Sequence, residues 1–468
     1  MIYGTPVSNV LLGTPDADII NGGAGGDDTL NGGDGDDRLI GGAGNDVLNG
    51  GAGHDVADYS GAASGVTVRL DRNQASSDGD GGADVLTGIE EVVGSAFNDV
   101  IFGDAGANVL RGGAGWDVIA GFDGDDIIYG GADTTNELYG GRGDDTYVVE
   151  NAGDTIIELV GEGVDTVQTA LNRLRLSAHV ENLTYTGTGG FEGYGNEEAN
   201  IIRGGTGRDV LAGFGGDDII YGGTGAANEL YGGQGNDYYV LDVADTVVEH
   251  EGEGIDTIDA RINTYALGAN VENLVFGGTG NFTGTGNSLN NYILGGAGDD
   301  VLRGGGGDDT LDGGLGHDEV HFRGAQGEYT VLAEGSGYRI IDNVADRDGS
   351  TFVTRVEALR FLTGNTVAEL SAAASPESGG KAEGPQVSPL LDDDAFILPG
   401  LQADKGVDFG PQVLPGTPDG GEWSKSFGFA HNGLAGLFDN PLVVAGPHGP
   451  LLLLEDAHTP VVANDPWG

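Results

Sequence analysis

The chain is built on a nine-residue unit, Gly-Gly-x-Gly-x-Asp-x-U-x, in which U is a large apolar residue. Residues 32–58 contain three consecutive copies, GGDGDDRLI, GGAGNDVLN and GGAGHDVAD, and the register recurs as far as His321. The glycines allow a tight turn, the Asp closes it, and the apolar side chain directs a short strand into a core. Because each unit supplies one turn and one strand, the repeat predicts an all-β parallel solenoid.

The composition supports a repeat and excludes several classes of protein. The 468 residues include 93 Gly and no Cys, and 75 acidic against 19 basic residues give a net charge of −56. That charge excludes a nucleic-acid binder, which needs a basic surface, and the lack of Cys excludes a disulfide framework. No apolar run reaches transmembrane length. The residues after Met1 lack the basic and apolar regions of a signal peptide.

The Asp of the unit, or an Asn in its place, recurs in four blocks. It is an Asp at fifteen positions: Asp18, Asp28, Asp37, Asp46, Asp55, Asp99, Asp117, Asp126, Asp145, Asp209, Asp218, Asp237, Asp300, Asp309 and Asp318. It is an Asn at five: Asn108, Asn136, Asn200, Asn228 and Asn291. The apolar position two residues later predicts a stacked interior column, formed by Ile20, Leu30, Leu39, Leu48, Ile101, Leu110, Ile119, Ile128, Leu302, Leu311 and Val320.

The spacing of these residues predicts calcium sites. Two units make one coil of 18 residues, so alternate turns stack, and Asp37 is expected to lie over Asp55. Stacked carboxylates repel each other unless a cation lies between them, and a flexible cage of carboxylate and carbonyl oxygens favours Ca²⁺ over Mg²⁺. Pairing alternate turns gives twelve candidate sites, seven between two Asp and five between Asp and Asn. The Asn pairs are expected to bind more weakly, because Asn brings no charge.

These motifs resemble the RTX family, the repeats-in-toxin (hemolysin-type calcium-binding) proteins exported by type I secretion. The resemblance covers the blocks at 13–58, 94–148, 195–240 and 286–321. The segments between and after them resemble the C-terminal domain of serralysin-like metalloproteases. The resemblance implies right-handed parallel β-rolls with Ca²⁺ in the turns, an extracellular location, and export by an ABC transporter through an uncleaved C-terminal signal. The five Asn positions, Ala57 and a long Pro-rich tail depart from the family pattern.

The blocks and the segments between them predict the organisation of the chain. Residues 204–294 are a tandem duplicate of 112–203, since WDVIAGFDGDDIIYGG matches RDVLAGFGGDDIIYGG and GEGVDT matches GEGIDT. The stretches at 149–194 and 241–285 lack glycine turns and are expected to be strands packed beside the roll. The predicted parts are a first calcium β-roll at 1–58, a β insertion at 59–93, a second roll with insertion at 94–203, a third at 204–294, a last roll at 295–321, an antiparallel β cap at 322–370, and a largely irregular tail at 371–468 that would carry the secretion signal.

Two other motifs are weaker candidates for metal sites. The sequence HDEVH at 317–321 resembles a zinc-binding helix, but its second residue is Asp and it lies in the repeat register, so zinc is not expected there. The acidic sequence DGDGG at 78–82 resembles the start of an EF-hand loop without the downstream Glu. A solvated turn is the favoured interpretation, with an extra calcium site as the alternative.

Two classes of function remain open. The first is a secreted structural, adhesive or matrix module, with calcium, the exporter and a cell-surface or matrix polysaccharide as partners. The second is an accessory or C-terminal module of a secreted metalloprotease or carbohydrate-active enzyme. The repeats begin close to Met1, so we expect no catalytic domain before them, no catalytic residues and no enzymatic activity.

Overall fold

The structure is a computed structural model that describes residues 1–370, 443–446 and 449–452. Within these ranges its regular structure is β, apart from two three-residue 3-10 turns at Leu70–Arg72 and Gln326–Glu328, and the predicted all-β fold is confirmed. The chain divides into two units, Met1–Gly380 and Lys381–Gly468. In the second unit, β42 (Val443–Gly446) and β43 (Gly449–Leu452) form an antiparallel hairpin. The other predictions for the tail, including the secretion signal, lie outside the described residues.

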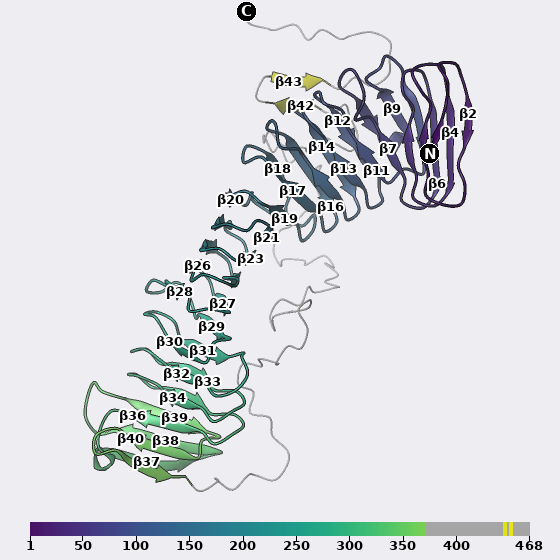
Figure 1. The fold of residues 1–468 in the computed structure, drawn as a ribbon. Helices are drawn as coiled ribbons and strands as arrows, with labels where there is room; N and C mark the ends of the chain where they lie inside the picture. Colours follow the sequence, from purple (N-terminus) through teal and green to yellow (C-terminus); the bar gives the residue numbers. More distant parts are fainter. Residues whose placement is uncertain (371–442, 447–448, 453–468) are drawn as a thin grey trace, which may run out of the picture. The chain divides into compact units, whose positions relative to one another are not determined.

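The first unit is a β-solenoid of about 17 turns (Figure 1). One face is a continuous 20-stranded sheet, and the other is divided into sheets of ten, five and six strands. The continuous sheet contains β1 (Ile2–Tyr3), β3 (Ile19–Asn21), β5 (Arg38–Ile40), β7 (Val56–Asp58), β11 (Glu91–Val93), β13 (Val109–Arg111), β15 (Ile127–Tyr129), β17 (Thr146–Val149), β19 (Thr166–Thr169), β21 (Asn182–Tyr185), β23 (Ile201–Arg203), β25 (Ile219–Tyr221), β27 (Tyr238–Leu241), β29 (Thr257–Ala260), β31 (Asn273–Phe276), β33 (Tyr292–Leu294), β35 (Thr310–Asp312), β37 (Tyr329–Glu334), β38 (Gly337–Asp342) and β39 (Ser350–Thr354).

The divided face carries the remaining strands of this unit. The ten-stranded sheet contains β2 (Val10–Leu12), β4 (Thr29–Asp34), β6 (Val47–Ala52), β8 (Thr67–Arg69), β9 (Gln74–Ser77), β10 (Asp84–Thr87), β12 (Val100–Phe102), β14 (Val118–Asp123), β16 (Glu137–Arg142) and β18 (Thr155–Ile157). The five-stranded sheet contains β20 (Arg173–Arg175), β22 (Glu192–Tyr194), β24 (Val210–Gly215), β26 (Glu229–Gln234) and β28 (Thr246–Val247). The six-stranded sheet contains β30 (Thr264–Ala266), β32 (Thr283–Thr285), β34 (Val301–Arg303), β36 (Glu319–Phe322), β40 (Ala358–Phe361) and β41 (Thr366–Glu369).

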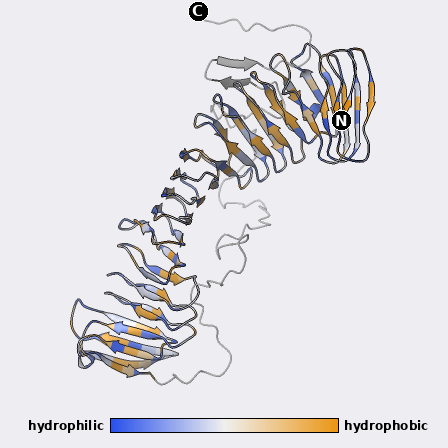
Figure 2. Cartoon of the chain, viewed as in Figure 1, coloured by the Kyte–Doolittle hydropathy of each residue, from blue (hydrophilic) through white to orange (hydrophobic). Residues whose placement is uncertain are grey.

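The strands pair in parallel at the spacing that two nonapeptides require. Arg38 pairs with Val56, eighteen residues later, and Val47 with Thr29, eighteen residues earlier. The apolar residue at the centre of each strand therefore stacks on its counterpart in the next turn. All eleven residues of the predicted interior column are fully buried. Figure 2 shows hydrophobic residues gathered on the strands of the roll, with polar residues in the turns between them.

The segment at 59–93 is built into the sheet. The strand β9 pairs antiparallel with both β8 and β10. The outer strands of this group then pair in parallel with the roll, β10 with β6 and β8 with β12. The stack of turns is therefore continuous across the insertion.

The prediction that 149–194 and 241–285 pack beside the roll is wrong. In the first stretch, β19 and β21 pair in parallel with each other and with the flanking strands β17 and β23. In the second, β29 and β31 pair in the same way with each other and with the flanking strands β27 and β33. Strand-centre residues such as Val167 and Leu183 are fully buried in the common core. These stretches are turns of the solenoid itself, because a coil needs an inward apolar residue on each strand but not a glycine turn.

The C-terminal end of the solenoid is closed by residues 322–370. Strands β37, β38 and β39 form an antiparallel meander. Its last strand, β39, pairs in parallel on β35, and β40 pairs in parallel on β36. The rings of Phe322, Tyr329 and Phe361 pack together beneath these strands. In the described part of the chain, no helix has the length and apolar character needed to cross a membrane.

Candidate calcium sites

All twenty predicted ligand residues lie immediately before a solenoid strand. The backbone N–H of nineteen of them donates to a side-chain oxygen of the following turn, whereas the Asp309 amide donates to the backbone carbonyl oxygen of Ser350. The Asp18 amide donates to Asp37 Oδ1 over 2.7 Å, and the Asp37 amide donates to Asp55 Oδ1 over 2.8 Å. All twelve predicted pairs are joined by such a bond, whether the acceptor is Asp or Asn. We call each continuous series of these bonds a ladder.

The second carboxylate oxygen of most of these Asp residues is buried and has no hydrogen-bond partner among the described residues. A buried charge without a partner is strongly unfavourable, and a cation bound to this oxygen would compensate that charge. This oxygen is without a partner in twelve of the fifteen predicted Asp: Asp28, Asp37, Asp46, Asp55, Asp117, Asp126, Asp145, Asp218, Asp237, Asp300, Asp309 and Asp318.

Each of these oxygens faces a glycine whose missing side chain leaves room beside it. A Cβ added to Gly32 would collide with Asp37 Oδ2 and would also lie 2.5 Å from the carbonyl oxygen of Gly50 in the next turn. The arrangement recurs at Gly112, which faces Asp117 Oδ2 and the carbonyl oxygen of Gly130. Carboxylate and carbonyl oxygens are the hard ligands that Ca²⁺ prefers. The residues present therefore fit calcium.

The electrostatics of the turns agree with this fit. Burial raises the pKa of Asp117 and of Asp126 to about 8, although a backbone N–H bonded to each carboxylate acts in the opposite direction. Neighbouring carboxylates raise these pKa values further. A cation would favour the charged form of each group instead.

At six of the twenty positions, the Asp or Asn side chain accepts a hydrogen bond from a backbone amide of its own turn, and we call these turns self-closed. The Gly205 amide donates to Asp209 Oδ2 over 2.8 Å, and the Thr14 amide donates likewise to Asp18 Oδ2. The Thr14 hydroxyl also donates to Asp18 and is the main reason that the pKa of this carboxyl is lowered. In each case the donor stands four residues before the acceptor. The six acceptors are Asp18, Asp99, Asp209, Asn108, Asn200 and Asn291.

The ladders extend beyond the nonapeptides, through residues that the repeat pattern does not include. The Asp145 amide donates to Asp165 Oδ1 over 2.8 Å, and the Asp165 amide donates to Glu181 Oε2 over 2.7 Å. The added Asp residues are Asp84, Asp154, Asp165, Asp245 and Asp256. Four ladders end on a Glu: Glu90, Glu181, Glu272 and Glu357. A sequence signal for these Glu residues exists, since each lies in an Ile/Val-Glu-x-Val/Leu motif (IEEV, VENL, VENL, VEAL).

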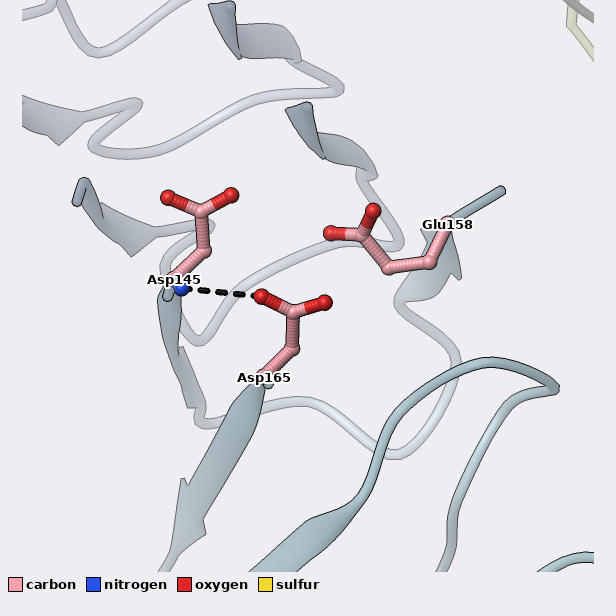
Figure 3. A group of neighbouring side chains, drawn as sticks. All are labelled: Asp145, Glu158 and Asp165. Atoms are coloured by element: carbon pink, nitrogen blue, oxygen red, sulfur yellow. Dashed lines mark hydrogen bonds between the residues drawn. The ribbon is translucent and has the colours of Figure 1, made fainter. Parts of the chain in front are cut away.

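Two groups of three buried carboxylates lie where nonapeptide blocks end. The first is Asp145, Glu158 and Asp165, shown in Figure 3, and the second is Asp237, Glu249 and Asp256 in the duplicated segment. In each group, one oxygen from every residue lies within 4.8 Å of the others. Burial raises the pKa of Glu158 and of Glu249 to about 8. Glu158 and Glu249 were not predicted as ligands from the sequence.

Of the two weaker motifs, the acidic one forms a loop between β9 and β10, and the other one enters a strand. Asp78 Oδ1 accepts the amides of Asp80, Gly81 and Gly82, so the acidic loop closes as a turn. The other oxygen of Asp78 is buried without a partner among the described residues, and the extra calcium site stays a prediction. The sequence HDEVH enters strand β36, where His321 Nε2 lies 2.9 Å from Glu319 Oε1.

Comparisons with known proteins agree with the repeat assignment. The family profile for the RTX calcium-binding nonapeptide repeat matches residues 3–27, 23–57, 86–115, 93–121, 106–136, 194–227, 224–243 and 285–320. The endo-1,3-1,4-beta-glycanase ExsH of Rhizobium meliloti (strain 1021) is 42% identical over 84 residues, which are 18% of either chain. The extracellular lipase LipA from Serratia marcescens matches 42% of this chain and 43% of its own, at 17% identity and a TM-score of 0.13. The chain thus spans less than half the length of either protein.

Proposed function

Because the chain is an RTX repeat protein whose nonapeptides bind calcium, we propose that it is a secreted β-roll that folds when calcium fills its turns. It would then act outside the cell as a structural, adhesive or matrix module. The observation that carries this proposal is the set of twelve buried Asp oxygens without a partner among the described residues. RTX β-roll repeats are generally non-catalytic, which favours a structural role over an enzymatic one.

Calcium would be held mainly by those twelve Asp residues and by the glycine carbonyl oxygens that face them. Asn136 and Asn228 stand in similar turns, but their side chains carry no charge, so they would be weaker ligands. The six residues of the self-closed turns would contribute least. The ion supplies positive charge between oxygens that otherwise repel each other, and the protein supplies the turn geometry.

The net charge of −56 supports a link between calcium and secretion. A chain with this charge repels itself and stays expanded without calcium, and a type I exporter needs an unfolded chain. Each ion that binds only the folded state adds about 2.7 kcal/mol of stability at a hundredfold excess over its Kd. Calcium outside the cell would therefore fold the chain after export.

The partial similarity to a glycanase supports the second candidate, an accessory module of a carbohydrate-active enzyme. The two candidates differ in what the folded protein does to a polysaccharide. A structural or adhesive module binds the polymer, or another surface, and does not change how fast a separate enzyme degrades it, whereas an accessory module raises that rate. A pull-down with matrix polysaccharides in millimolar calcium, run beside assays of a separate glycanase or protease with and without this chain, separates them.

The fold-on-calcium proposal is tested by circular dichroism of the full chain. Sites of this extracellular class have Kd values of roughly 10⁻⁴–10⁻³ M. We expect a coil spectrum in chelator and a β spectrum in millimolar Ca²⁺. Mg²⁺ at equal concentration is the control, and it should restore little β signal because it demands stricter octahedral geometry. A β spectrum that chelator leaves unchanged would overturn the proposal.

A further inference from the structure

The two buried carboxylate groups occupy equivalent places in the duplicated segment. Asp145 precedes β17, Glu158 follows β18 and Asp165 precedes β19 (Figure 3). Their counterparts are Asp237, Glu249 and Asp256, each 91 or 92 residues later. In both places, the first residue belongs to the last glycine turn of a block, and the other two belong to turns outside the nonapeptide pattern. The arrangement therefore recurs with the whole 91-residue unit.

The Glu lies where other turns present a glycine carbonyl oxygen. At Gly112, the space beside the glycine is shared by an Asp oxygen and by a carbonyl oxygen of the next turn. At Gly140, it is shared by Asp145 Oδ2, Glu158 Oε1 and the Tyr147 hydroxyl. In the turn that follows Gly140, the oxygen nearest to this space is therefore the side-chain Oε1 of Glu158 and not a backbone carbonyl oxygen. The Glu side chain adds a negative charge that a carbonyl oxygen lacks.

Five oxygens of these groups are buried without a hydrogen-bond partner among the described residues, whereas Glu158 Oε1, the oxygen beside Gly140, is bonded to Tyr147. Asp145 is 1% exposed and Glu158 is 6% exposed, and Asp145 Oδ2 and Glu158 Oε2 have no hydrogen-bond partner among the described residues. The same holds for Asp237 Oδ2, Glu249 Oε2 and Asp256 Oδ2. The other oxygen of each Glu accepts a hydrogen bond from a buried tyrosine, Tyr147 or Tyr239. This bond fixes the direction of the Glu side chain.

We propose that each group is a buried calcium site that closes a nonapeptide block, with Glu158 or Glu249 in place of the glycine carbonyl oxygen. The inference rests on the proposed calcium-dependent fold and extends it to ligands outside the repeat. The donors are all oxygen, with neither His nor Cys, which excludes a typical zinc site. Mg²⁺ gives up its water reluctantly, so a dry site favours Ca²⁺. Affinity follows the number of charged ligands, so these two sites bind calcium more tightly than turns with one Asp and carbonyl oxygens.

The test is a calcium count on the full chain, with Glu158→Gln and Glu249→Gln combined. Gln keeps the size of Glu and the oxygen that accepts from tyrosine, but it removes the charge. Equilibrium dialysis is run at the lowest free calcium that folds the parental protein. We expect the variant to bind two fewer ions. The matched control combines Glu150→Gln with Glu251→Gln, two exposed residues outside the groups, and should keep the parental count.

The outcomes separate this inference from the proposed function. A parental chain that binds no calcium refutes both. A parental chain that binds calcium, with an unchanged count in the Glu158→Gln, Glu249→Gln variant, refutes only the inference.

A second measurement tests the inference even if that variant fails to fold. Tb³⁺ bound in these sites would be excited by the adjoining tyrosines, so Tyr147→Phe combined with Tyr239→Phe should lower tyrosine-sensitised Tb³⁺ luminescence well below that of the parental protein. Unchanged luminescence would overturn the inference.

Discussion

The backbone conformation of the residue four positions before the Asp distinguishes eleven of the twelve turns with an unpartnered oxygen from the self-closed turns; the exception is Asp28, where the glycine of positive φ, Gly23, stands five positions earlier. Before Asp37 this residue is Gly33, whose φ of 116° lies in the left-handed region that favours glycine. Before Asp18 it is Thr14, which does not have a positive φ. Its amide donates to Asp18 Oδ2 and so closes the turn. Phe122 adopts the glycine-like conformation, with a φ of 88°, and Asp126 four residues later has an unpartnered oxygen. The backbone conformation, rather than the residue type, thus correlates with the free oxygen.

The two kinds of turn predict different losses when the Asp is removed. Asp37→Ala removes an unpartnered buried oxygen and disturbs the pairs with both Asp18 and Asp55. Asp209→Ala disturbs one predicted pair, with Asn228, in a turn that Gly205 already closes. We expect calcium titrations to show weakened binding of two ions in the first variant and a smaller loss in the second. The reverse order would contradict the assignment of the register.

Protons should substitute for calcium in these turns. The pKa of Asp117 and of Asp126 is about 8 and that of Asp145 about 7 in the folded chain, against about 3.9 when unfolded. Raised values mean that the calcium-free fold is most stable below the unfolded pKa and loses this stability as pH rises toward 8. Calcium-depleted protein should therefore show more β signal by circular dichroism at pH 4 than at pH 8. Calcium added at pH 8 should restore the signal. A calcium-free β signal that grows with pH would be inconsistent with these pKa shifts.

At the scale of elements, the Glu-terminated turns mark where one ladder ends and the next begins. Glu181 stands directly before β21, and its longer side chain reaches the Asp165 amide over 2.7 Å. Its counterpart Glu272 accepts the Asp256 amide before β31. On each side of the roll, the first residue of the next ladder is not acidic. One such first residue is Phe191, whose amide donates to Asp209 Oδ1. Phe191 stacks on Tyr185 with ring centroids 4.5 Å apart, so apolar packing replaces the carboxylate there.

Removing the terminal Glu should destabilise the folded solenoid without removing a nonapeptide. Glu181→Ala leaves the Asp165 amide without its acceptor, and an unsatisfied buried donor costs about 1–3 kcal/mol. Urea unfolding in saturating calcium should show that loss. Glu181→Gln keeps an acceptor oxygen and serves as the control, with a smaller effect. Equal losses in the two variants would mean that the charge of Glu181, and not its hydrogen bond, is what matters.

The sequence predicts the nonapeptide turns well because glycine, Asp and the apolar residue each have a fixed place in the unit. Leu39 and Leu48 were expected in the core and are fully buried. The sequence does not predict that 149–194 and 241–285 are turns of the solenoid, because strands such as β19 have the required apolar centre, Val167, but are not preceded by the complete glycine pattern of the repeat. Glu158 could not be found from the repeat, since it reaches the end of a block from a neighbouring turn. The Ile/Val-Glu-x-Val/Leu motif was visible, but its role depends on which amide lies one turn earlier.

At the scale of the whole molecule, the folding unit and the proposed secretion signal fall in different parts of the chain. The described solenoid and its closing segment end at Leu370, and the signal is proposed within 371–468. Deleting 371–468 should therefore leave calcium-dependent folding of the purified protein intact, as measured by circular dichroism. Co-expressed with its exporter, the truncated chain should remain in the cell, whereas the full chain reaches the medium. Full secretion of the truncated chain would place the signal elsewhere or exclude type I export.

The ladder bonds give the solenoid a polarity, because each turn is completed by the turn that follows it. The acceptor for the Asp37 amide and the carbonyl oxygen beside Gly32 both come from the later turn. At the C-terminal end, the closing segment takes over this task, with Glu357 accepting the Asp318 amide and the Arg355 carbonyl oxygen facing Gly313. Shortening the molecule from its first turn leaves every remaining ladder with its acceptors, although strand amides such as that of Arg38 lose the carbonyl oxygen of an earlier turn. Shortening it from the other side removes the acceptor of the last ladder amide at each step, so the ligand turns are completed only from the C-terminal side.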